Sequence, residues 1–352
     1  MSWNANVRRV VPYVPGEQPK STDVVKLNTN ENPYPPAPAV RKALQEMSAG
    51  YDLLRKYPDP DASILTDALS EAYGIDPDRI FVGVGSDDVL AMAFQTFFNS
   101  DRPVLFADVT YSFYKVWCEL FDIPYELVPV RDDFTIDPDA YKLPNGGIVI
   151  ANPNAPTSMA MDVSVLESVI SGNPDSVVIV DEAYVDFGGA SMLPFLDGHD
   201  NLLVVQTFSK SRSMAGARIG MAFGQPQLIS YLKDVKFSFN SYTMSQEVQR
   251  VGAASLSDVQ YFTDTLHRII RTRDAAVPRL KKLGFTCLPG SANFLFATHV
   301  SRPAVEIFDE LKRRNIFVRH FDQPRISNYL RITIGTDEEM EKLYAALSEI
   351  LQ

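Results

Sequence analysis

Residues 177–184, VVIVDEAY, place two acidic residues at the end of an uninterrupted apolar run. A strand that is apolar on both faces is typical of a parallel sheet covered by helices on each side. Similar short runs alternate with helical patterns between about residues 63 and 225: FVGVG at 81–85, VLFAD at 104–108, GIVIAN at 147–152 and LLVVQT at 202–207. This alternation predicts an α/β fold whose polar residues gather at the carboxyl ends of the strands, where open α/β sheets bind ligands.

The length of 352 residues exceeds what one hydrophobic core usually supports, so we expect a large domain and a smaller one. A helical stretch over 255–283, interrupted or kinked near Pro278 and ended by Gly284, opens a small α+β region. The beginning of the chain is rich in proline and asparagine and predicts an extended arm. The boundaries that we infer are 1–43 for the arm, 44–254 for the large domain and 255–352 for the small domain.

Composition excludes several classes of function. The formal net charge of -11 argues against binding to nucleic acid, because the phosphate backbone repels an acidic surface. No apolar run approaches the ~18 to 20 residues that span a bilayer, and the first residues do not resemble a signal peptide. Two cysteines, Cys118 and Cys287, and four scattered histidines match no metal-ligand spacing. We expect a cytoplasmic protein that binds no metal, membrane or nucleic acid.

Asp181 ends the run VVIVD, and a carboxylate there is costly to desolvate without a cationic or hydrogen-bonding partner. Tyr184 follows three residues later and can face the same edge of the sheet. The alternative reading is that Asp181 only caps a helix, a common use of aspartate. The pair indicates a site without specifying it.

Lys210 lies in VQTFSKSRSMA at 205–215, three residues after another apolar run. Taken alone, it reads as an ordinary solvent-exposed lysine. Its neighbours favour a phosphate site, because hydroxyls and a guanidinium hold phosphate well: Thr207, Ser209 and Arg218. The glycines of VGVGSDD at 82–88 add main-chain N–H groups at the start of a helix. The chain has neither GxGxxG nor GxxxxGK[ST], so hydride transfer and nucleoside triphosphate chemistry lose support.

A lysine, a phosphate site and a buried aspartate together meet the needs of pyridoxal phosphate. This cofactor needs an amine for its aldehyde, a cup for its phosphate and an anion against its pyridine nitrogen. The protonated ring then serves as an electron sink when the substrate Cα proton is removed, and the freed lysine shuttles that proton.

The ordered segments of the chain resemble those of fold-type I aminotransferases, and among them the histidinol-phosphate aminotransferase family. The matching segments run over nearly the whole length: PYVPGEQP, LNTNENPYPP, RKYPDP, GSDD, VTYSFY, NPNAPT, DEAY, TFSK with AGARIG, and YLRITIG. The resemblance implies a mostly parallel seven-stranded sheet covered by helices. It also implies a small C-terminal domain, an arm that packs on that domain and on a partner subunit, and a homodimer with a shared active site.

The resemblance also assigns roles. It implies that Lys210 forms the internal aldimine, that Asp181 pairs with the pyridine nitrogen and that Tyr184 bonds the phenolic oxygen. It places Tyr111 against the ring. The phosphate ligands that it implies are Ser86 and Asp87 through main-chain N–H groups, Thr207, Ser209, Arg218, and Tyr57 from the other subunit. For Tyr111 and Tyr57 the alternative is ordinary packing.

One position departs from the family pattern, which reads NPNNPTG in this segment. Ala155 stands where the family has the asparagine that contacts the cofactor's phenolic oxygen, and Ser158 stands in place of the final glycine. Asn154, one residue earlier, is our candidate to supply the amide. We expect the change to alter the protonation of the cofactor rather than its binding, because the phosphate cup and Asp181 remain.

Substrate recognition is expected in the small domain and the arm. The resemblance implies that Arg331 in YLRITIG grips a carboxylate, and that Arg319 and Tyr13 help to hold a substrate phosphate. The alternative for Arg319 is an ion pair with Asp322. Glu31 and Asn32 either order the entrance or only pack.

The resemblance implies a ping-pong exchange of histidinol phosphate and 2-oxoglutarate for imidazole acetol phosphate and glutamate, in histidine biosynthesis. One alternative is an aromatic-amino-acid aminotransferase, which shares these motifs. More distant alternatives are a decarboxylase of the phosphothreonine type and a cofactor-binding protein without activity.

Overall fold

The computed structural model describes residues 3–21, 23–48 and 54–352 of the chain. Its centre is a seven-stranded sheet in the order β2-β8-β7-β6-β5-β3-β4, in which β8 alone runs antiparallel to its neighbours. The strands are β2 (Ile80–Gly83), β3 (Val104–Ala107), β4 (Tyr125–Val128), β5 (Gly147–Ala151), β6 (Val178–Asp181), β7 (Leu202–Thr207) and β8 (Gly220–Phe223). The expected α/β fold with a mostly parallel seven-stranded sheet is confirmed.

Alternate residues of the central strands feed two separate layers of core. In β6, Val178 and Val180 pack on one face, and Ile179 packs on the other. The first face is covered by α2 (Ser63–Tyr73), α5 (Val163–Ser171) and α7 (Gln246–Ser257), and α1 (Pro38–Ser48) packs on α7. The second face is covered by α3 (Ser86–Phe97), α4 (Phe113–Phe121) and α6 (Pro226–Phe239). Helices on both faces explain why these strands are apolar throughout.

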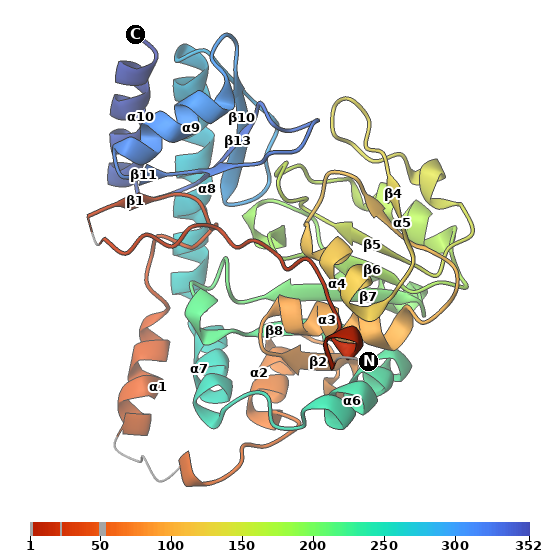
Figure 1. Ribbon diagram of the computed structural model, residues 1–352. Helices are drawn as coiled ribbons and strands as arrows, with labels where there is room; N and C mark the ends of the chain where they lie inside the picture. The colour runs from red at the N-terminus through yellow and green to blue at the C-terminus, as the bar shows by residue number, and fades with distance from the viewer. Residues whose placement is uncertain (1–2, 22, 49–53) are drawn as a thin grey trace.

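The C-terminal region has its own antiparallel sheet, in the order β12-β13-β10-β9, and its own core. Its strands are β9 (Phe285–Cys287), β10 (Phe294–His299), β12 (Arg319–His320) and β13 (Leu330–Thr333). The helices α8 (Val259–Lys282), α9 (Ala304–Arg313) and α10 (Asp337–Ile350) complete it. Figure 1 shows this part at the upper left, away from the central sheet.

The N-terminal arm connects the two parts. After a 3-10 turn at Trp3–Asn6, Arg8 pairs with Asp122 at the end of α4 at 2.9 Å. The arm then runs to β1 (Val25–Lys26), which pairs in parallel with β11 (Ile316–Phe317) of the C-terminal region. In Figure 1 it crosses the front of the molecule before turning down into α1. Two-residue pairing with β11 therefore fixes the arm over the space between the two parts.

Two local predictions differ from the structure. The stretch expected as one helix over 255–283 contains the end of α7 and the start of α8, with a break at Asp258. The helix α8 passes through Pro278 without ending there, because residues packed against it hold the helix on both sides of the proline. The antiparallel strand β8 was not anticipated, since GMAF is short and follows a loop rather than a helix.

Candidate active site

A cleft of about 890 Å³ opens at the carboxyl ends of the central strands. The arm, the large domain and the C-terminal region all contribute to its walls. Predicted residues that line it are Tyr13, Glu31, Ser86, Asp87, Tyr111, Asp181, Tyr184, Ser209, Lys210, Arg218, Arg319 and Arg331. Residues from β6, from the loop after β7, from β13 and from the arm thus meet in one place, and those that follow β6 and β7 do so as the strand-end argument predicts.

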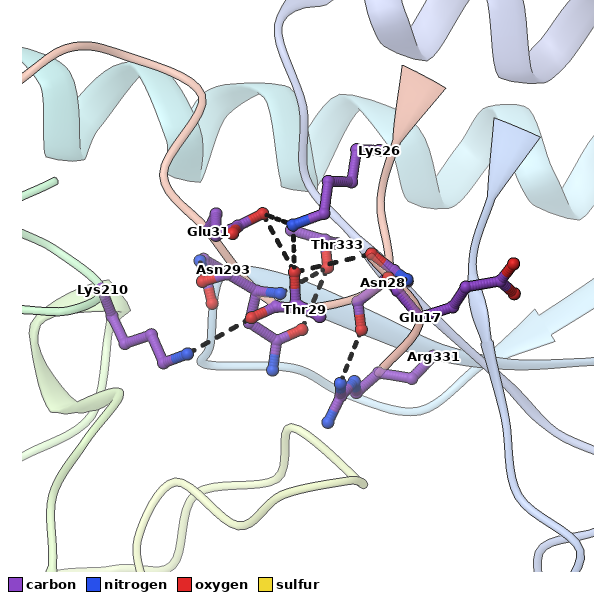
Figure 2. A network of polar contacts seen from close by, with 10 residues as sticks. Glu17, Lys26, Asn28, Thr29, Glu31, Lys210, Asn293, Arg331 and Thr333 are labelled. Carbon is purple, nitrogen blue, oxygen red and sulfur yellow. Dashed lines mark hydrogen bonds and ion pairs between the residues drawn. The ribbon is translucent and has the colours of Figure 1, made fainter. Parts of the chain in front are cut away.

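Lys210 reaches into this cleft from the loop that follows β7. Its Nζ lies 3.4 Å from the main-chain oxygen of Thr29 and 5.5 Å from the centre of the Tyr184 ring. Figure 2 shows the lysine extended toward Thr29, with Glu31 and Lys26 above them in the view. These contacts involve no carboxylate partner for Nζ among the residues that the structure describes. The amine is therefore held in place by weak contacts that a ligand can replace.

Asp181 is buried at the end of β6. Its Oδ2 accepts a 2.7 Å hydrogen bond from the Tyr114 hydroxyl, and its Oδ1 accepts one of 3.2 Å from the main-chain N–H of Ala183. Burial raises the pKa of this carboxyl to about 6, although both hydrogen bonds lower it. Within the described chain no lysine, arginine or histidine forms an ion pair with Asp181. A cationic ligand group beside it would relieve the cost of burying the charge.

The start of α3 forms a cradle for an anion. Gly85 precedes the helix with φ 90°, and no side chain of the described residues caps its first N–H groups. A Cβ on Gly220 would lie 2.3 Å from the main-chain nitrogen of Ser86, so the close approach of β8 needs glycine there. Arg218 lies across this turn and contacts Asp87 at 3.3 Å. Free N–H groups at a helix start beside a guanidinium are the arrangement that binds phosphate.

The segment TFSK carries two hydroxyls near the cradle, on Thr207 and Ser209. Thr207 is buried, donates to the main-chain oxygen of Ile219 and lies 3.0 Å from the Ser209 hydroxyl. Thr207 does not line the cleft, whereas Ser209 does. The structure therefore places Thr207 behind Ser209.

Aromatic rings form one wall of the cleft. The Tyr111 hydroxyl donates a 2.9 Å hydrogen bond to Asp87, and burial raises the pKa of Tyr111 well above its ordinary value. Tyr13 of the arm stacks on Phe113 with ring centres 4.2 Å apart and lies 6.3 Å from Tyr111. A flat ring bound in this cleft would meet aromatic faces from both the large domain and the arm.

Two arginines lie at the opposite end. Arg331 of β13 donates to the main-chain oxygen of Asn28 at 2.9 Å, and its buried Nε has no hydrogen-bond partner among the described residues. Burial lowers the pKa of Arg331. Arg319 donates to the main-chain oxygens of Val14 and Pro15, at 3.3 and 3.5 Å, instead of pairing with Asp322. An unpaired buried donor on a guanidinium is suited to an anionic ligand.

The family model for aminotransferase class I and II matches residues 22–347. The chain belongs to the class I and II aminotransferases. Over 352 residues it is 49% identical to the histidinol-phosphate aminotransferase of Lactococcus lactis subsp. cremoris (strain MG1363), covering 100% of this chain and 98% of that protein. It is 50% identical over 355 residues to the enzyme of the same name from Aromatoleum aromaticum, covering 99% of each.

Solved structures of two enzymes share the fold. The histidinol-phosphate aminotransferase of Sinorhizobium meliloti, solved in complex with pyridoxal-5'-phosphate, has a TM-score of 0.83 at 24% identity, covering 93% of this chain and 91% of that one. The L-threonine-O-3-phosphate decarboxylase of Porphyromonas gingivalis has a TM-score of 0.80 at 21% identity, covering 93% of this chain and 99% of that one. At these identities the structures establish the fold alone.

Besides Thr207, three candidate residues of this aminotransferase do not line the cleft: Tyr57, Asn32 and Asn154. Tyr57 is 80% exposed and stacks on Tyr242 with ring centres 4.6 Å apart. Asn32 donates to the main-chain oxygens of Lys210 and Ser211, at 3.1 Å each, so it holds the lysine loop and does not border the entrance. Asn154 uses both amide hydrogens, on Val109 and Thr157, and accepts from Thr110.

The arrangement of Asn154 does not support its predicted contact with the cofactor. Its neighbour Ala155 does line the cleft, as do Pro153 and Pro156, and none of these three carries a side-chain donor. Ser158 is buried, and its hydroxyl accepts from the main-chain N–H of Ala292 in the C-terminal region. Ala155 thus brings no amide to the cleft, and Ser158 links the two parts of the molecule.

Residues that the sequence did not single out complete this site. Tyr114 holds Asp181, Thr29 contacts Lys210, and Asn30 donates to the Tyr184 hydroxyl at 2.9 Å. Tyr114 and Asn30 lie within VTYSFY and LNTNENPYPP, so the segments were recognised although the residues were not. No spacing rule identifies such contacts, because the partners are far apart in the chain.

Among the described residues of the chain, no helix is both long enough and apolar enough to cross a bilayer. Nor do its described histidine, cysteine and acidic side chains form a group of three that is suited to a metal ion.

Proposed function

We propose that this aminotransferase uses pyridoxal 5'-phosphate to exchange histidinol phosphate and 2-oxoglutarate for imidazole acetol phosphate and glutamate, in histidine biosynthesis. The observation that carries the proposal is the meeting, in one cleft, of Lys210, the buried Asp181, the cradle at α3 and two arginines. Relatives 49% and 50% identical over their full length, named histidinol-phosphate aminotransferases, support the choice of substrate.

The residues present fit the cofactor. The buried Asp181 carboxylate needs a cationic partner, which a protonated pyridine nitrogen provides. Gly85 has φ 90°, which residues with a Cβ rarely adopt, and the turn that it makes leaves main-chain N–H groups open to a phosphate. Ser86, Asp87, Ser209 and Arg218 would hold that phosphate, supported by Thr207. When bound, the cofactor supplies an electron sink that makes the substrate Cα–H acidic.

The side chains of this chain bind and orient the substrate and move its proton. Lys210, released from Thr29, takes the Cα proton with its Nζ and returns it to the substrate-derived carbon. Tyr111 would pack the face of its ring against the cofactor ring, and the Tyr184 hydroxyl would hydrogen-bond the cofactor's phenolic oxygen. Arg331 has a free Nε and Arg319 is freed by breaking two long bonds to the arm.

The two arginines explain how one cleft takes two substrates. A guanidinium binds a carboxylate or a phosphate with the same two-pronged geometry. Glutamate and 2-oxoglutarate would therefore place their carboxylates where histidinol phosphate places its phosphate, with Tyr13 closing that end. The Tyr13 hydroxyl has a raised pKa through burial and stays a neutral donor at physiological pH.

We also propose a homodimer with shared active sites. Tyr57 and Tyr242 are exposed, together with Leu54, Phe237 and Phe239 nearby in sequence or space. A stacked, exposed tyrosine pair on a monomer favours burial against a second copy, from which Tyr57 would reach the other phosphate cradle. The thiols Cys118 and Cys287 are unpaired, which agrees with a reducing cytoplasm.

Chemical trapping tests this proposal. The protein is incubated with pyridoxal 5'-phosphate, reduced with borohydride and digested with a protease. The modified peptide is then identified by mass spectrometry. The modification is expected on Lys210, and the Lys210→Ala variant is expected to lose it. Modification at another lysine, or none, would remove the basis of the proposal.

An aromatic-amino-acid aminotransferase is the second candidate, and the stacked wall of Tyr13, Phe113 and Tyr111 favours it. That wall also suits an imidazole ring. The two activities differ at the arginine end, where histidinol phosphate presents a phosphate and phenylalanine presents a carboxylate. Comparative turnover of the two amines separates them.

A further inference from the structure

Asn30 of the arm lies against Tyr184 and is buried, with 1% of its surface exposed. Its side-chain amide donates a 2.9 Å hydrogen bond to the Tyr184 hydroxyl oxygen. The residue has φ 58°, in the left-handed region, which asparagine and aspartate tolerate better than other side chains. Asn30 therefore adopts an uncommon backbone conformation in a buried position, and this conformation places its amide against Tyr184.

The orientation of the Asn30 amide is set by the C-terminal region. The Thr333 hydroxyl accepts from the Asn30 main-chain N–H at 3.0 Å and gives its one hydrogen to the Asn30 Oδ1, also at 3.0 Å. Asn293 donates to the Asn30 main-chain oxygen at 3.0 Å. Figure 2 shows Thr333 and Asn293 gathered around this turn of the arm. Because Oδ1 is occupied by a donor, the Nδ2 side must face Tyr184.

This contact determines what the Tyr184 hydroxyl does. The hydroxyl oxygen receives the Asn30 amide hydrogen, so its own hydrogen is left to donate elsewhere. Tyr184 lines the cleft and packs against the cluster that contains Ala155, and the lining residues Pro153, Ala155 and Pro156 carry no side-chain donor. Tyr184 is therefore the hydroxyl that serves this wall of the cleft, in the place that the Ala155 segment leaves without an amide.

We propose that Asn30 is a positioning residue for the reaction, acting through Tyr184. It fixes the phenol so that its O–H points into the cleft, toward the phenolic oxygen of the cofactor. This inference rests on the proposed function. It also makes the arm and β13 part of the active site, because their contacts orient the amide.

Replacement of Asn30 by aspartate tests the proposal. Asn30→Asp keeps the shape, the tolerance for φ 58° and the acceptor for Thr333, but it replaces the donor with a carboxylate. That carboxylate takes the Tyr184 hydroxyl hydrogen and withdraws it from the cleft. The cofactor's phenolic oxygen then loses a donor and holds its shared proton more tightly. The pH midpoint of the visible spectrum of the loaded protein is expected to rise by about one unit.

A double-mutant comparison separates this role from general damage. Tyr184→Phe should raise the same midpoint, and Asn30→Asp added to Tyr184→Phe should raise it no further. An unchanged midpoint in Asn30→Asp, or a further full shift in the double variant, would overturn the proposal. If Asn30→Asp does not fold by circular dichroism, Asn30→Gly suits the same φ, and a smaller upward shift is expected; no shift would overturn the proposal.

The same titration distinguishes the two levels of argument. A wild-type protein that takes up no pyridoxal phosphate would contradict the proposed function, and this inference with it. A loaded wild type with an unaffected Asn30→Asp variant would contradict the role of Asn30 alone.

Discussion

Among single residues, Asp181 shows how burial sets the charge of the cleft. The fold removes the carboxylate from water and returns two hydrogen bonds, which do not fully offset the loss of hydration. Its pKa is consequently raised to about 6. In the cofactor-free protein the buried charge of Asp181 lowers the free energy of unfolding, and a cationic ligand beside it would offset this loss.

This loss predicts a pH dependence of stability. Between the ordinary aspartate pKa, about 3.9, and about 6, the folded protein binds more protons at Asp181 than the unfolded chain does. The contribution of Asp181 to the free energy of unfolding should therefore fall as pH rises through this window, by on the order of 3 kcal/mol, and level off above it. Urea unfolding of the cofactor-free protein at pH 4 to 7 measures this.

Asp181→Asn is the matched variant, because its amide oxygen still accepts from Tyr114. It should lose this part of the fall while keeping the part due to Glu182, whose pKa burial raises to about 7. The same pH profile in both proteins would show that Asp181 is not the group responsible.

Arg331 gives a second prediction at this scale. Arg331→Lys keeps the charge but loses the two-pronged geometry, so KM for glutamate should rise about 10- to 100-fold, from a lost charged hydrogen bond. The control is Arg313→Lys on the exposed face of α9, where the arginine pairs with Glu310. Equal effects of the two changes would contradict a special role for Arg331.

Lys210, Asp181 and Arg218 were singled out from the chemistry of their short segments and Arg331 from the family resemblance, and the structure brings all four to one cleft. Asn30 and Tyr114 could not be predicted in either way, since their roles depend on partners 154 and 67 residues away. For Asn32 and Asn154, recognition of the segment placed the residue near the site. Only the hydrogen bonds showed that their amides serve the main chain and neighbouring side chains.

Among the elements, the junction of β8 with the start of α3 shapes the phosphate cradle. The parallel strands were predictable because each is an apolar run before a helical pattern. The antiparallel β8 was not, because its four residues gain their place only by pairing between β2 and β7. The break at Asp258 was missed for a related reason, since α7 and α8 pack on different parts of the molecule.

Gly220 provides the test at this scale. A Cβ there would lie 2.2 Å from the Gly85 carbonyl carbon, a main-chain atom that cannot move aside cheaply. Gly220→Ala should separate β8 from α3 and weaken the binding of pyridoxal phosphate about 10- to 100-fold, as expected for overpacking. Fluorescence titration with the cofactor measures this affinity.

Gly198→Ala is the control, because a Cβ at Gly198 meets nothing within 4 Å. It should bind the cofactor as the wild type does. Unweakened binding in Gly220→Ala would show that the close approach of β8 is not needed for the cradle.

In the whole molecule, the arm and the C-terminal region supply residues to the cleft at the carboxyl ends of the central strands. The contact between Arg325 and Asp108, at 2.8 Å, joins the C-terminal region to the end of β3 beside the cleft. Tyr57 is 80% exposed and does not line the cleft of a single chain. Tyr57 was singled out because it lies in the segment RKYPDP. The contacts that the structure describes for it within one chain do not lead to a phosphate cradle.

Subunit mixing tests the shared site. Lys210→Ala and Tyr57→Phe homodimers should each be impaired, the first severely. Mixed one to one and allowed to exchange, they should recover about a quarter of wild-type activity, because half of the dimers then carry one intact site. Absence of any recovery, with exchange confirmed by tagged subunits, would place Tyr57 outside the partner's active site.

The central claim is that the cleft is an aminotransferase site for histidinol phosphate. The most direct measurement is a side-by-side assay of the loaded enzyme with histidinol phosphate, phenylalanine and phosphothreonine, following keto product and carbon dioxide. We predict the highest kcat/KM for histidinol phosphate, glutamate formation from 2-oxoglutarate and no carbon dioxide. Faster turnover of phenylalanine, or release of carbon dioxide from phosphothreonine, would contradict the account.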